Sequence, residues 1–231
     1  CTLKTKAANL ERGALAALET LGVDFEEMPR WNCCGAVFSL ADDDLIHHVA
    51  PVRDLIRAQG LGADAVVTLC SQCYNTLARA THLMRSAEEK RNTINAFMNA
   101  EEDYRGELEV LHYLAVLRDQ VGWDALRAKV SKPLDGLKVA PFYGCTLVRP
   151  TEVSVDGPHP ELFEHFLRAL GAEPVAWSGA TECCGSYQAL GHPEASADRA
   201  AQVLASAHRA GADAIALSCP LCEFNLGTRQ A

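Results

Sequence analysis

The chain has 231 residues, of which 48% are hydrophobic and 22% charged, and its formal net charge is −9 at pH 7. This length accommodates one large domain or two smaller ones, and the composition is that of an ordinary globular protein. Acidic balance without a basic block excludes nucleic acid as the expected partner. No run approaches the roughly 20 apolar residues that cross a bilayer, so we expect no transmembrane segment.

The first half of the chain predicts alternating helices and strands. Apolar residues recur at helical spacing over 6–21 and 42–59. Between these helices, residues 23–25 predict a short strand. A buried strand over 63–69 ends at a cysteine, and residues 75–84 predict the following helix.

Residues 88–131 interrupt this order. They are highly charged at first and predict a helical insertion with one further strand, at 108–112. The second half then repeats the earlier order. The predicted strands are 136–144 and 211–217, each ending at a cysteine, and the predicted helices are 160–170 and 194–210.

The cysteines form a repeat. Asn32-Cys33-Cys34-Gly35 returns as Glu182-Cys183-Cys184-Gly185, and each doublet has a lone cysteine upstream and a Cys-x-x-Cys motif downstream. The two sets account for all ten cysteines, which are Cys1, Cys33, Cys34, Cys70 and Cys73 in one, and Cys145, Cys183, Cys184, Cys219 and Cys222 in the other. The chain is therefore an internal duplication of a five-thiolate site.

The repeat also predicts the architecture. Residues 62–73 match 211–222 closely, and strands alternate with helices so that functional groups follow the carboxyl ends of strands. We predict an α/β fold of two duplicated Rossmann-like parallel-sheet half-domains related by a pseudo-twofold, with a helical insertion between them. The predicted domains are 1–131, with the insertion at about 88–131, and 132–231. The pseudo-twofold is expected to bring the two sites near a shared interface.

Several kinds of site use cysteines in such numbers. Disulfides suit small secreted domains with little core, and a Cys-x-x-Cys motif that opens a helix is usual for metal or redox chemistry. Structural zinc takes four ligands, so a five-cysteine set holds one more than zinc uses, although zinc in one site remains an alternative. A cubane [4Fe–4S] cluster commonly uses a compact run of cysteines, which this sequence lacks. We therefore expect a reducing, cytoplasmic compartment. Five cysteines in each set indicate either a cluster that is not an ordinary cubane or a cubane with a spare thiolate used for chemistry.

The doublets have a geometric consequence. Neighbouring side chains in an extended segment diverge, so the two thiolates can reach different irons of one cluster. Gly35 and Gly185 allow a positive φ or a close backbone approach to a bulky cluster. Five residues near the motifs are weaker candidates for substrate contacts, and these are Lys4, Lys6, Arg149, Ser186 and Tyr187.

The two complete motifs resemble the CCG motifs of the B subunit of heterodisulfide reductase, whose pattern is a lone Cys, Cys-Cys-Gly and Cys-x-x-Cys, present twice. The resemblance covers essentially the whole chain. It implies two noncubane [4Fe–4S] clusters, each with five cysteine ligands. The first set would be Cys1, Cys33, Cys34, Cys70 and Cys73, and the second Cys145, Cys183, Cys184, Cys219 and Cys222.

The resemblance also implies a function. The chain would be the catalytic subunit that reduces a disulfide, such as the mixed disulfide of coenzymes M and B, placed between the two clusters. Electrons would come from a ferredoxin-like C subunit, fed by a flavin-containing A subunit that can bifurcate electrons. An alternative is an electron-transfer CCG subunit of a glycolate or lactate oxidase or a fumarate reductase type complex. A zinc or disulfide scaffold would leave the duplicated fifth cysteine unexplained.

Overall fold

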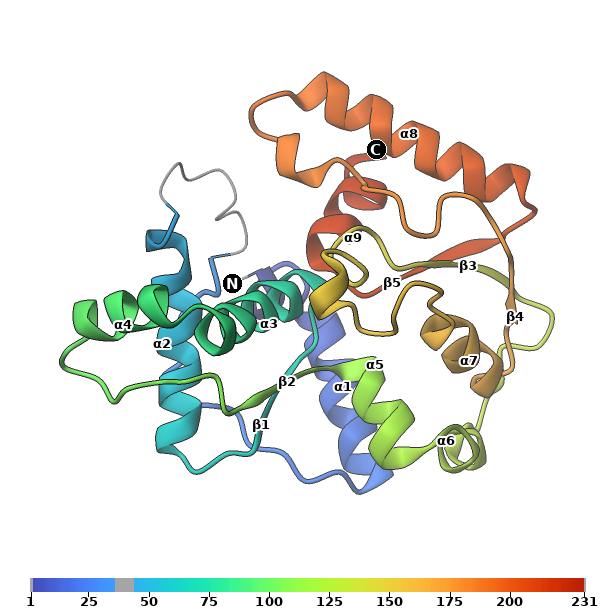
Figure 1. Cartoon of the computed structure of the whole chain (residues 1–231). Helices are drawn as coiled ribbons and strands as arrows, with labels where there is room; N and C mark the ends of the chain where they lie inside the picture. The colour runs from blue at the N-terminus through green and yellow to red at the C-terminus, as the bar shows by residue number, and fades with distance from the viewer. Residues whose placement is uncertain (1, 36–43, 231) are drawn as a thin grey trace. The chain divides into compact units, whose positions relative to one another are not determined.

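The computed structural model describes residues 2–35 and 44–230, except for the side chain of residue 230. The chain divides into two compact units (Figure 1). Phe25–His112 forms one, which we call the inner unit, and the chain before and after it forms the other, which we call the outer unit.

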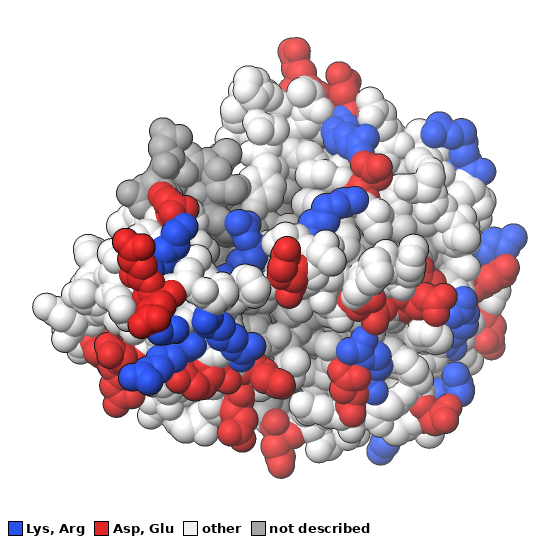
Figure 2. Space-filling model, viewed as in Figure 1, with Lys and Arg blue, Asp and Glu red and all other residues white. Residues whose placement is uncertain are grey.

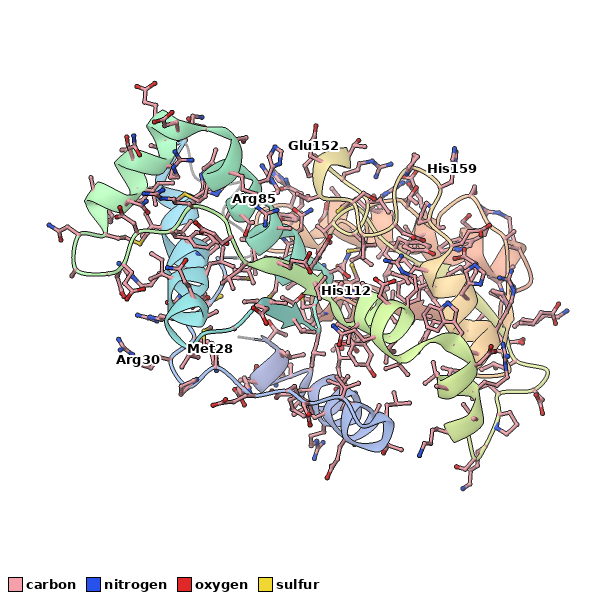
Figure 3. All side chains as sticks on the ribbon, turned by 60° about the horizontal axis from the view of Figure 1, so that its bottom comes forward. Met28, Arg30, Arg85, His112, Glu152 and His159 are labelled. Atoms are coloured by element: carbon pink, nitrogen blue, oxygen red, sulfur yellow. The ribbon has the colours of Figure 1, made fainter. Side chains whose placement is uncertain are left out.

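The inner unit contains three helices and two strands in its described part. These are α2 (Ile46–Gly60), β1 (Ala65–Thr68), α3 (Ser71–Ser86), α4 (Glu88–Phe97) and β2 (Glu109–His112). The strands are parallel, with register running from Ala65 opposite Glu109 to Thr68 opposite His112. Figure 3 labels His112 at the end of β2. A parallel pair requires a crossover, which α3 and α4 supply here.

Apolar faces of the three helices form the core of the inner unit. Leu55 of α2, Leu77 and Met84 of α3 and Ile94 of α4 belong to one buried cluster. The loop before β2 is fastened to this core by Arg85, whose guanidinium donates to the carbonyl of Leu108 at 3.2 Å. Figure 3 labels Arg85 beside this segment. The packing therefore fixes the end of α3 relative to β2.

The outer unit has a three-stranded parallel sheet in the order β4 (Glu173–Pro174), β3 (Lys138–Phe142), β5 (Ala214–Leu217). Its register pairs Val139 with Ala214 and Phe142 with Leu217. The other elements are η1 (Thr2–Lys4), α1 (Ala8–Leu21), α5 (Tyr113–Val116), the π-helical η3 (Leu117–Val121), α6 (Trp123–Lys129), η4 (Thr151–Val153), α7 (Leu162–Ala169), η5 (Ser186–Gln188), α8 (Pro193–Arg209), α9 (Pro220–Leu226) and η6 (Thr228–Gln230).

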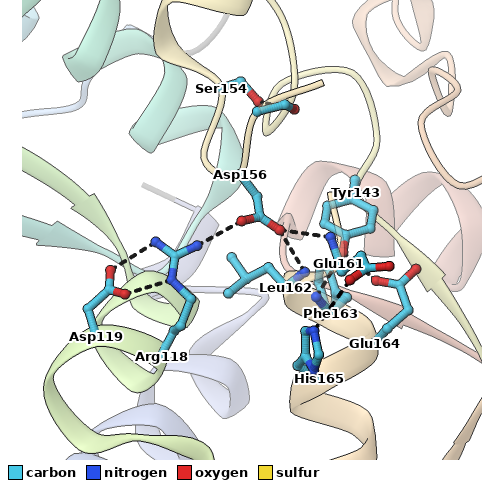
Figure 4. A network of polar contacts seen from close by, with 11 residues as sticks. Arg118, Asp119, Tyr143, Ser154, Asp156, Glu161, Leu162, Phe163, Glu164 and His165 are labelled. Atoms are coloured by element: carbon cyan, nitrogen blue, oxygen red, sulfur yellow. Dashed lines mark hydrogen bonds and ion pairs between the residues drawn. The ribbon is translucent and has the colours of Figure 1, made fainter. Parts of the chain in front are cut away.

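A polar network holds the start of α7 (Figure 4). Asp156 accepts hydrogen bonds from the backbone N–H groups of Glu161 and Leu162 at 2.7 and 2.9 Å, and from Arg118 at 2.8 Å. The hydroxyl of buried Tyr143, which directly follows β3, accepts from the N–H of Phe163 at 2.9 Å. N–H groups at a helix start lack partners within the helix, so these contacts satisfy them.

The element predictions hold in outline. The helix predicted over 6–21 is α1, the strands predicted over 63–69, 136–144 and 211–217 are β1, β3 and β5, and the two later helices are α7 and α8. Part of the helix predicted over 42–59 lies outside the described residues, and the rest is α2.

One element prediction is wrong. The predicted strand at 23–25 is irregular backbone, and Phe25 is exposed, so this segment lacks the neighbour on which a strand depends. The helix expected over 75–84 is confirmed as part of α3, which begins at Ser71, directly after Cys70.

The mixed α/β class with parallel strands is confirmed. The pseudo-twofold duplication stays a prediction, as do the domains 1–131 and 132–231, which divide the chain differently from the two compact units. Acidic and basic side chains are interspersed on the face shown in Figure 2. Within the described residues, none of the helices combines the length and apolarity that crossing a membrane requires.

Candidate metal centres

Each Cys-x-x-Cys motif opens a helix. Cys70 is the N-cap of α3 and Cys219 the N-cap of α9, with φ and ψ of −116° and 124° in one and −130° and 118° in the other. Both cap carbonyls accept from the residue four positions on, Tyr74 at 2.9 Å and Glu223 at 3.0 Å. The second cysteine of each motif lies in the first helical turn, where N–H groups and the helix dipole favour negative charge.

In the inner unit, four predicted site cysteines converge. The sulfur atoms of Cys34 and Cys73 lie 3.1 Å apart. Cys33 also hydrogen bonds with Cys34, and Cys70 with Cys73. The doublet and the Cys-x-x-Cys motif therefore meet although they lie far apart in the chain, as the 39-residue separation of Cys34 and Cys73 shows. Cys1 lies outside the described residues, and η1, which follows it, packs on α9 of the outer unit.

In the outer unit, all five cysteines of the second set converge. The sulfur atoms of Cys184 and Cys222 lie 3.3 Å apart. Further hydrogen bonds join Cys145 to Cys183, Cys183 to Cys184 and Cys219 to Cys222. This clustering follows from the sheet, because Cys145 and Cys219 follow the carboxyl ends of the adjacent parallel strands β3 and β5.

The glycine of each doublet has the left-handed backbone that the motif predicts. Gly35 has a φ of +76° and Gly185 a φ of +83°. A Cβ on Gly185 would lie 3.2 Å from the Cβ of Arg199 on α8, whereas a Cβ on Gly35 would meet nothing within 4 Å among the described atoms. Glycine is thus required twice over at 185, for its backbone and for the approach of α8.

Hydrogen bonding within each set lowers the pKa of one thiol. The bond with Cys73 lowers the pKa of the Cys34 thiol, although burial and the charge of Asp54 oppose this. Bonds with Cys145 and Cys184 lower the pKa of the Cys183 thiol, and the charge of Arg199 adds in the same direction. Each set can therefore hold negative charge on sulfur.

Polar groups around the second doublet fix its backbone. Arg199 of α8 donates from Nε to the carbonyl of Cys183 at 3.0 Å. Asn225 of α9, only 1% exposed, donates to the carbonyl of Cys184 and accepts from the hydroxyl of Ser196 at 3.0 Å. The doublet is thereby fastened to both α8 and α9.

A different group fixes the first doublet. Asp54 of α2, 5% exposed, accepts from the N–H of Asn32 at 2.8 Å. Burial raises the pKa of Asp54 to about 6. Arg57 donates to the side-chain oxygen of Asn32 at 2.9 Å and to the carbonyl of Arg30 at 2.7 Å. Figure 3 labels Arg30 and Met28 in the segment that leads to this doublet.

The sequence did not reveal these supporting residues. Asp54 carries a signal in hindsight, since it is an acidic residue on the apolar, buried face of α2, beside Leu55 and Ile56. Two of the weaker candidates form contacts within the protein. Arg149 donates to the carbonyl of Thr181 at 2.7 Å, and Lys4 pairs with Glu11.

The donor sets fit a thiolate-ligated group, but not a preformed site for one ion. Within the part of the chain that the structure describes, no three His, Cys, Asp or Glu side chains are arranged to hold a metal ion. Tetrahedral zinc with Zn–S bonds of about 2.3 Å would separate its sulfurs by about 3.8 Å, so thiols in mutual contact must move apart to bind. A set made only of thiols, with helix N–H groups nearby, is the donor chemistry of iron–sulfur clusters.

Fold and site together define a cysteine-rich α/β protein with two thiolate sites at strand ends. The CCG cysteine-rich domain family matches residues 1–78 and 139–227. The chain belongs to this family, and its likeness to the B subunits of heterodisulfide reductases is confirmed.

Three relatives illustrate the range of the family. The 8-methylmenaquinol:fumarate reductase membrane anchor subunit of Wolinella succinogenes is 33% identical over the whole chain and 80% of that protein. The B subunit of the ferredoxin/F(420)H(2)-dependent CoB-CoM heterodisulfide reductase of Methanosarcina acetivorans is 30% identical over the whole chain and 78% of its own length. The B subunit of a ferredoxin:CoB-CoM heterodisulfide reductase of Methanosarcina mazei is 28% identical with the same coverage. The chain is thus an iron–sulfur subunit related to both kinds of complex.

Proposed function

We propose that this chain is the catalytic subunit of a cytoplasmic heterodisulfide-reductase-type complex. It would reduce a disulfide, either the mixed disulfide of coenzymes M and B or a related one, at two noncubane [4Fe–4S] clusters. Electrons would come from a ferredoxin-like partner subunit supplied by a flavin-containing subunit that can bifurcate electrons. The observation that carries the proposal is the convergence of a doublet with its Cys-x-x-Cys motif in both copies.

The reaction sets the number of electrons that must be delivered. Reducing RS–SR′ to RSH and R′SH breaks one sulfur–sulfur bond and consumes two electrons and two protons. Iron–sulfur clusters, when bound, exchange electrons one at a time. Two sites in one chain suit a two-electron reaction of this kind, and the reduced ferredoxin-like partner is the reductant.

The residues of the chain have separate parts in this proposal. The first site would be held by Cys1, Cys33, Cys34, Cys70 and Cys73, and the second by Cys145, Cys183, Cys184, Cys219 and Cys222. The starts of helices α3 and α9 would stabilise negative charge on sulfurs bound to a cluster. Burial of Cys34 and Cys184, at 6% and 3% exposure, keeps water from the centre of each set.

A second function has support of its own. The 33% identity to a fumarate reductase membrane anchor subunit favours an electron-transfer role in a complex of that type. The chain would then relay electrons between a quinol and another subunit, and no disulfide would be its substrate. Both functions use the same clusters, so cluster content does not separate them.

The test is disulfide turnover by the complex purified without oxygen. Reduced viologen dye would supply electrons, and free thiols would be counted after adding candidate disulfides, among them that of coenzymes M and B. We expect two thiols per disulfide and two dye electrons, with loss of turnover in Cys183→Ser. Full cluster content without turnover of these disulfides, together with quinol-dependent fumarate reduction, would establish the second function instead.

A further inference from the structure

The helices beside the two doublets, α2 and α8, can be aligned on the sequence that follows them. Each is followed by the same tripeptide, Gly62-Ala63-Asp64 after α2 and Gly211-Ala212-Asp213 after α8. Aligning the tripeptides places the last residue of α2 on the last residue of α8. In this alignment Ala50 corresponds to Arg199, and Asp54 corresponds to Val203. The duplicated helices therefore differ in charge at two positions that face the doublets.

In the second copy a cation lies against the doublet. Arg199 Nε donates to the carbonyl of Cys183 at 3.0 Å, and its side chain is 34% exposed. The same guanidinium pairs with Glu182, whose side chain is 53% exposed. The pair is oriented with its positive member toward the cysteines and its negative member toward solvent.

In the first copy the order is reversed. The carboxylate of Asp54 bonds to the N–H of Asn32, the residue before Cys33, and Asp54 is 5% exposed. The cation here is Arg57, 21% exposed, which bonds to the carbonyl of Arg30 and lies 3.9 Å from Glu101. Ala50 offers only its carbonyl, which accepts from Asn32 at 3.2 Å. Arg57 also donates to the side-chain oxygen of Asn32 at 2.9 Å. Of these two charged residues that bond to Asn32, Asp54 is the more buried, and it holds the backbone that leads into the doublet.

The direction of these charges affects electron affinity. Adding an electron to a metal–thiolate centre adds negative charge, which a nearby cation stabilises and a nearby anion opposes. Interactions between charges are weak in water and stronger where solvent is displaced. Each doublet contains a buried cysteine, Cys34 or Cys184, so a charge beside it acts where little water is present. Charge and hydrogen bonding near the sulfurs are among the factors that set cluster potentials.

We propose that the two sites are electrostatically inequivalent: Arg199 makes the second site the stronger electron acceptor, and Asp54 makes the first the stronger donor. This inference rests on the proposed binding of one cluster in each set. It ranks the two sites by electron affinity, with the second site above the first. Arg199 and Asp54 are positioning residues, because they act through the cysteines.

The test is a potentiometric titration of the anaerobic holoprotein, followed by EPR, at about pH 8, where Asp54 is ionised. The variants are Arg199→Gln, Arg199→Lys, Asp54→Asn and the double variant Arg199→Gln/Asp54→Asn. Arg127→Gln is the control. Arg127 forms an ion pair with Asp124, and the two side chains are 58% and 97% exposed, respectively.

We expect Arg199→Gln to lower the midpoint potential of one cluster and Asp54→Asn to raise that of the other. Arg199→Lys should stay close to the parent, and the double variant should narrow the gap between the clusters. Potentials unchanged in both single variants, or both clusters shifting equally in each, would overturn the inference. If Arg199→Gln fails to bind the second cluster, Asp54→Asn still tests the inference, because it changes the charge beside the first site.

Failure of this inference is distinguishable from failure of the proposed function. Iron-free protein would overturn both. Separate shifts of the two potentials without disulfide turnover would support the electrostatic inference and contradict the proposed reaction. Disulfide turnover, together with midpoint potentials that change in neither the Arg199 nor the Asp54 variant, would support the proposed reaction and contradict the electrostatic inference.

Discussion

The sulfur atoms of Cys34 and Cys73 lie 3.1 Å apart, and those of Cys184 and Cys222 lie 3.3 Å apart. In both copies, the second cysteine of the doublet meets the second cysteine of the Cys-x-x-Cys motif. The same pair of motif positions is thus in contact in both sites, which lie some 150 residues apart in the sequence. This shared contact is the structural form of the sequence repeat.

Removing a cysteine from one of these pairs should empty one site only. Cys34→Ser replaces a soft thiolate with a hydroxyl, a poor ligand for iron in such clusters. We expect its iron content to fall to about half of the parent value, and Cys184→Ser to do the same. The double variant should lose nearly all iron. Metal analysis with acid-labile sulfide measures this, and a single variant that retains full iron would contradict it.

Alanine at Gly185 should destabilise the fold more than alanine at Gly35. Both positions have positive φ, which costs an alanine roughly 1–2 kcal/mol. Among the described atoms, a Cβ at Gly185 would also meet Arg199 and Ser196, whereas a Cβ at Gly35 would meet none within 4 Å. Thermal unfolding of the two variants tests this difference. Equal losses would show that the backbone angle alone accounts for both glycines.

Replacing Asn225 with leucine should weaken the outer unit. The side chain is 1% exposed and bonds to the carbonyl of Cys184, to Ser196 and to Arg229. Leaving those buried groups without partners costs roughly 1–3 kcal/mol. Thr228→Ala is the control, since Thr228 bonds to Glu223 at an exposed position and should change stability by less than about 0.5 kcal/mol. Denaturant unfolding that ranks the control as the more damaging change would contradict the assigned role.

Buried His112 should make stability fall in mild acid. Burial lowers its pKa to about 3, whereas an unfolded histidine titrates near 6.5. Below pH 6.5 the unfolded chain therefore binds the additional proton, and stability is lost as pH falls from 6.5 toward 3. This single group contributes a slope of at most about 1.4 kcal/mol per pH unit.

His112→Asn should flatten the pH dependence of unfolding between pH 7 and 5.5. His48, with a pKa lowered to about 4 by burial, acts in the same direction and remains in the variant. Asp54, with its raised pKa, acts in the opposite direction, because its folded form gains a proton first as pH falls. Comparing slopes between parent and variant isolates His112. If the free energy of unfolding has the same pH dependence in parent and variant, His112 does not cause the loss of stability in mild acid.

The sequence predicted most helices and strands because those features have local signals, whereas the two cysteine ligand sets stay predictions. Strands such as β1 and β5 lie in mainly apolar runs and end two residues before a cysteine, and a doubled cysteine motif leaves few alternative groupings of the cysteines. The strand predicted at 23–25 failed because a strand depends on a neighbour that sequence periodicity does not show. Its counterpart in the second copy, β4, has such a neighbour in β3.

The supporting residues depended on tertiary contacts instead. Asp54 and Arg199 reach the doublets from helices that lie far from them in sequence, and their helix positions differ between the copies. Only the structure shows that the carboxylate of Asp54 contacts the residue before the first doublet and that the guanidinium of Arg199 contacts the second doublet. The repeat predicted two similar sites, and the contacts around the doublets differ between the two copies.

The measurement that tests the two-cluster assignment most directly is iron and sulfide per chain in protein purified without oxygen. Two [4Fe–4S] clusters predict about eight irons and eight sulfides per chain, falling to about four of each when either doublet is changed to serine. Zinc in place of iron, or a full complement that survives loss of one doublet, would contradict the assignment of one cluster to each five-cysteine set.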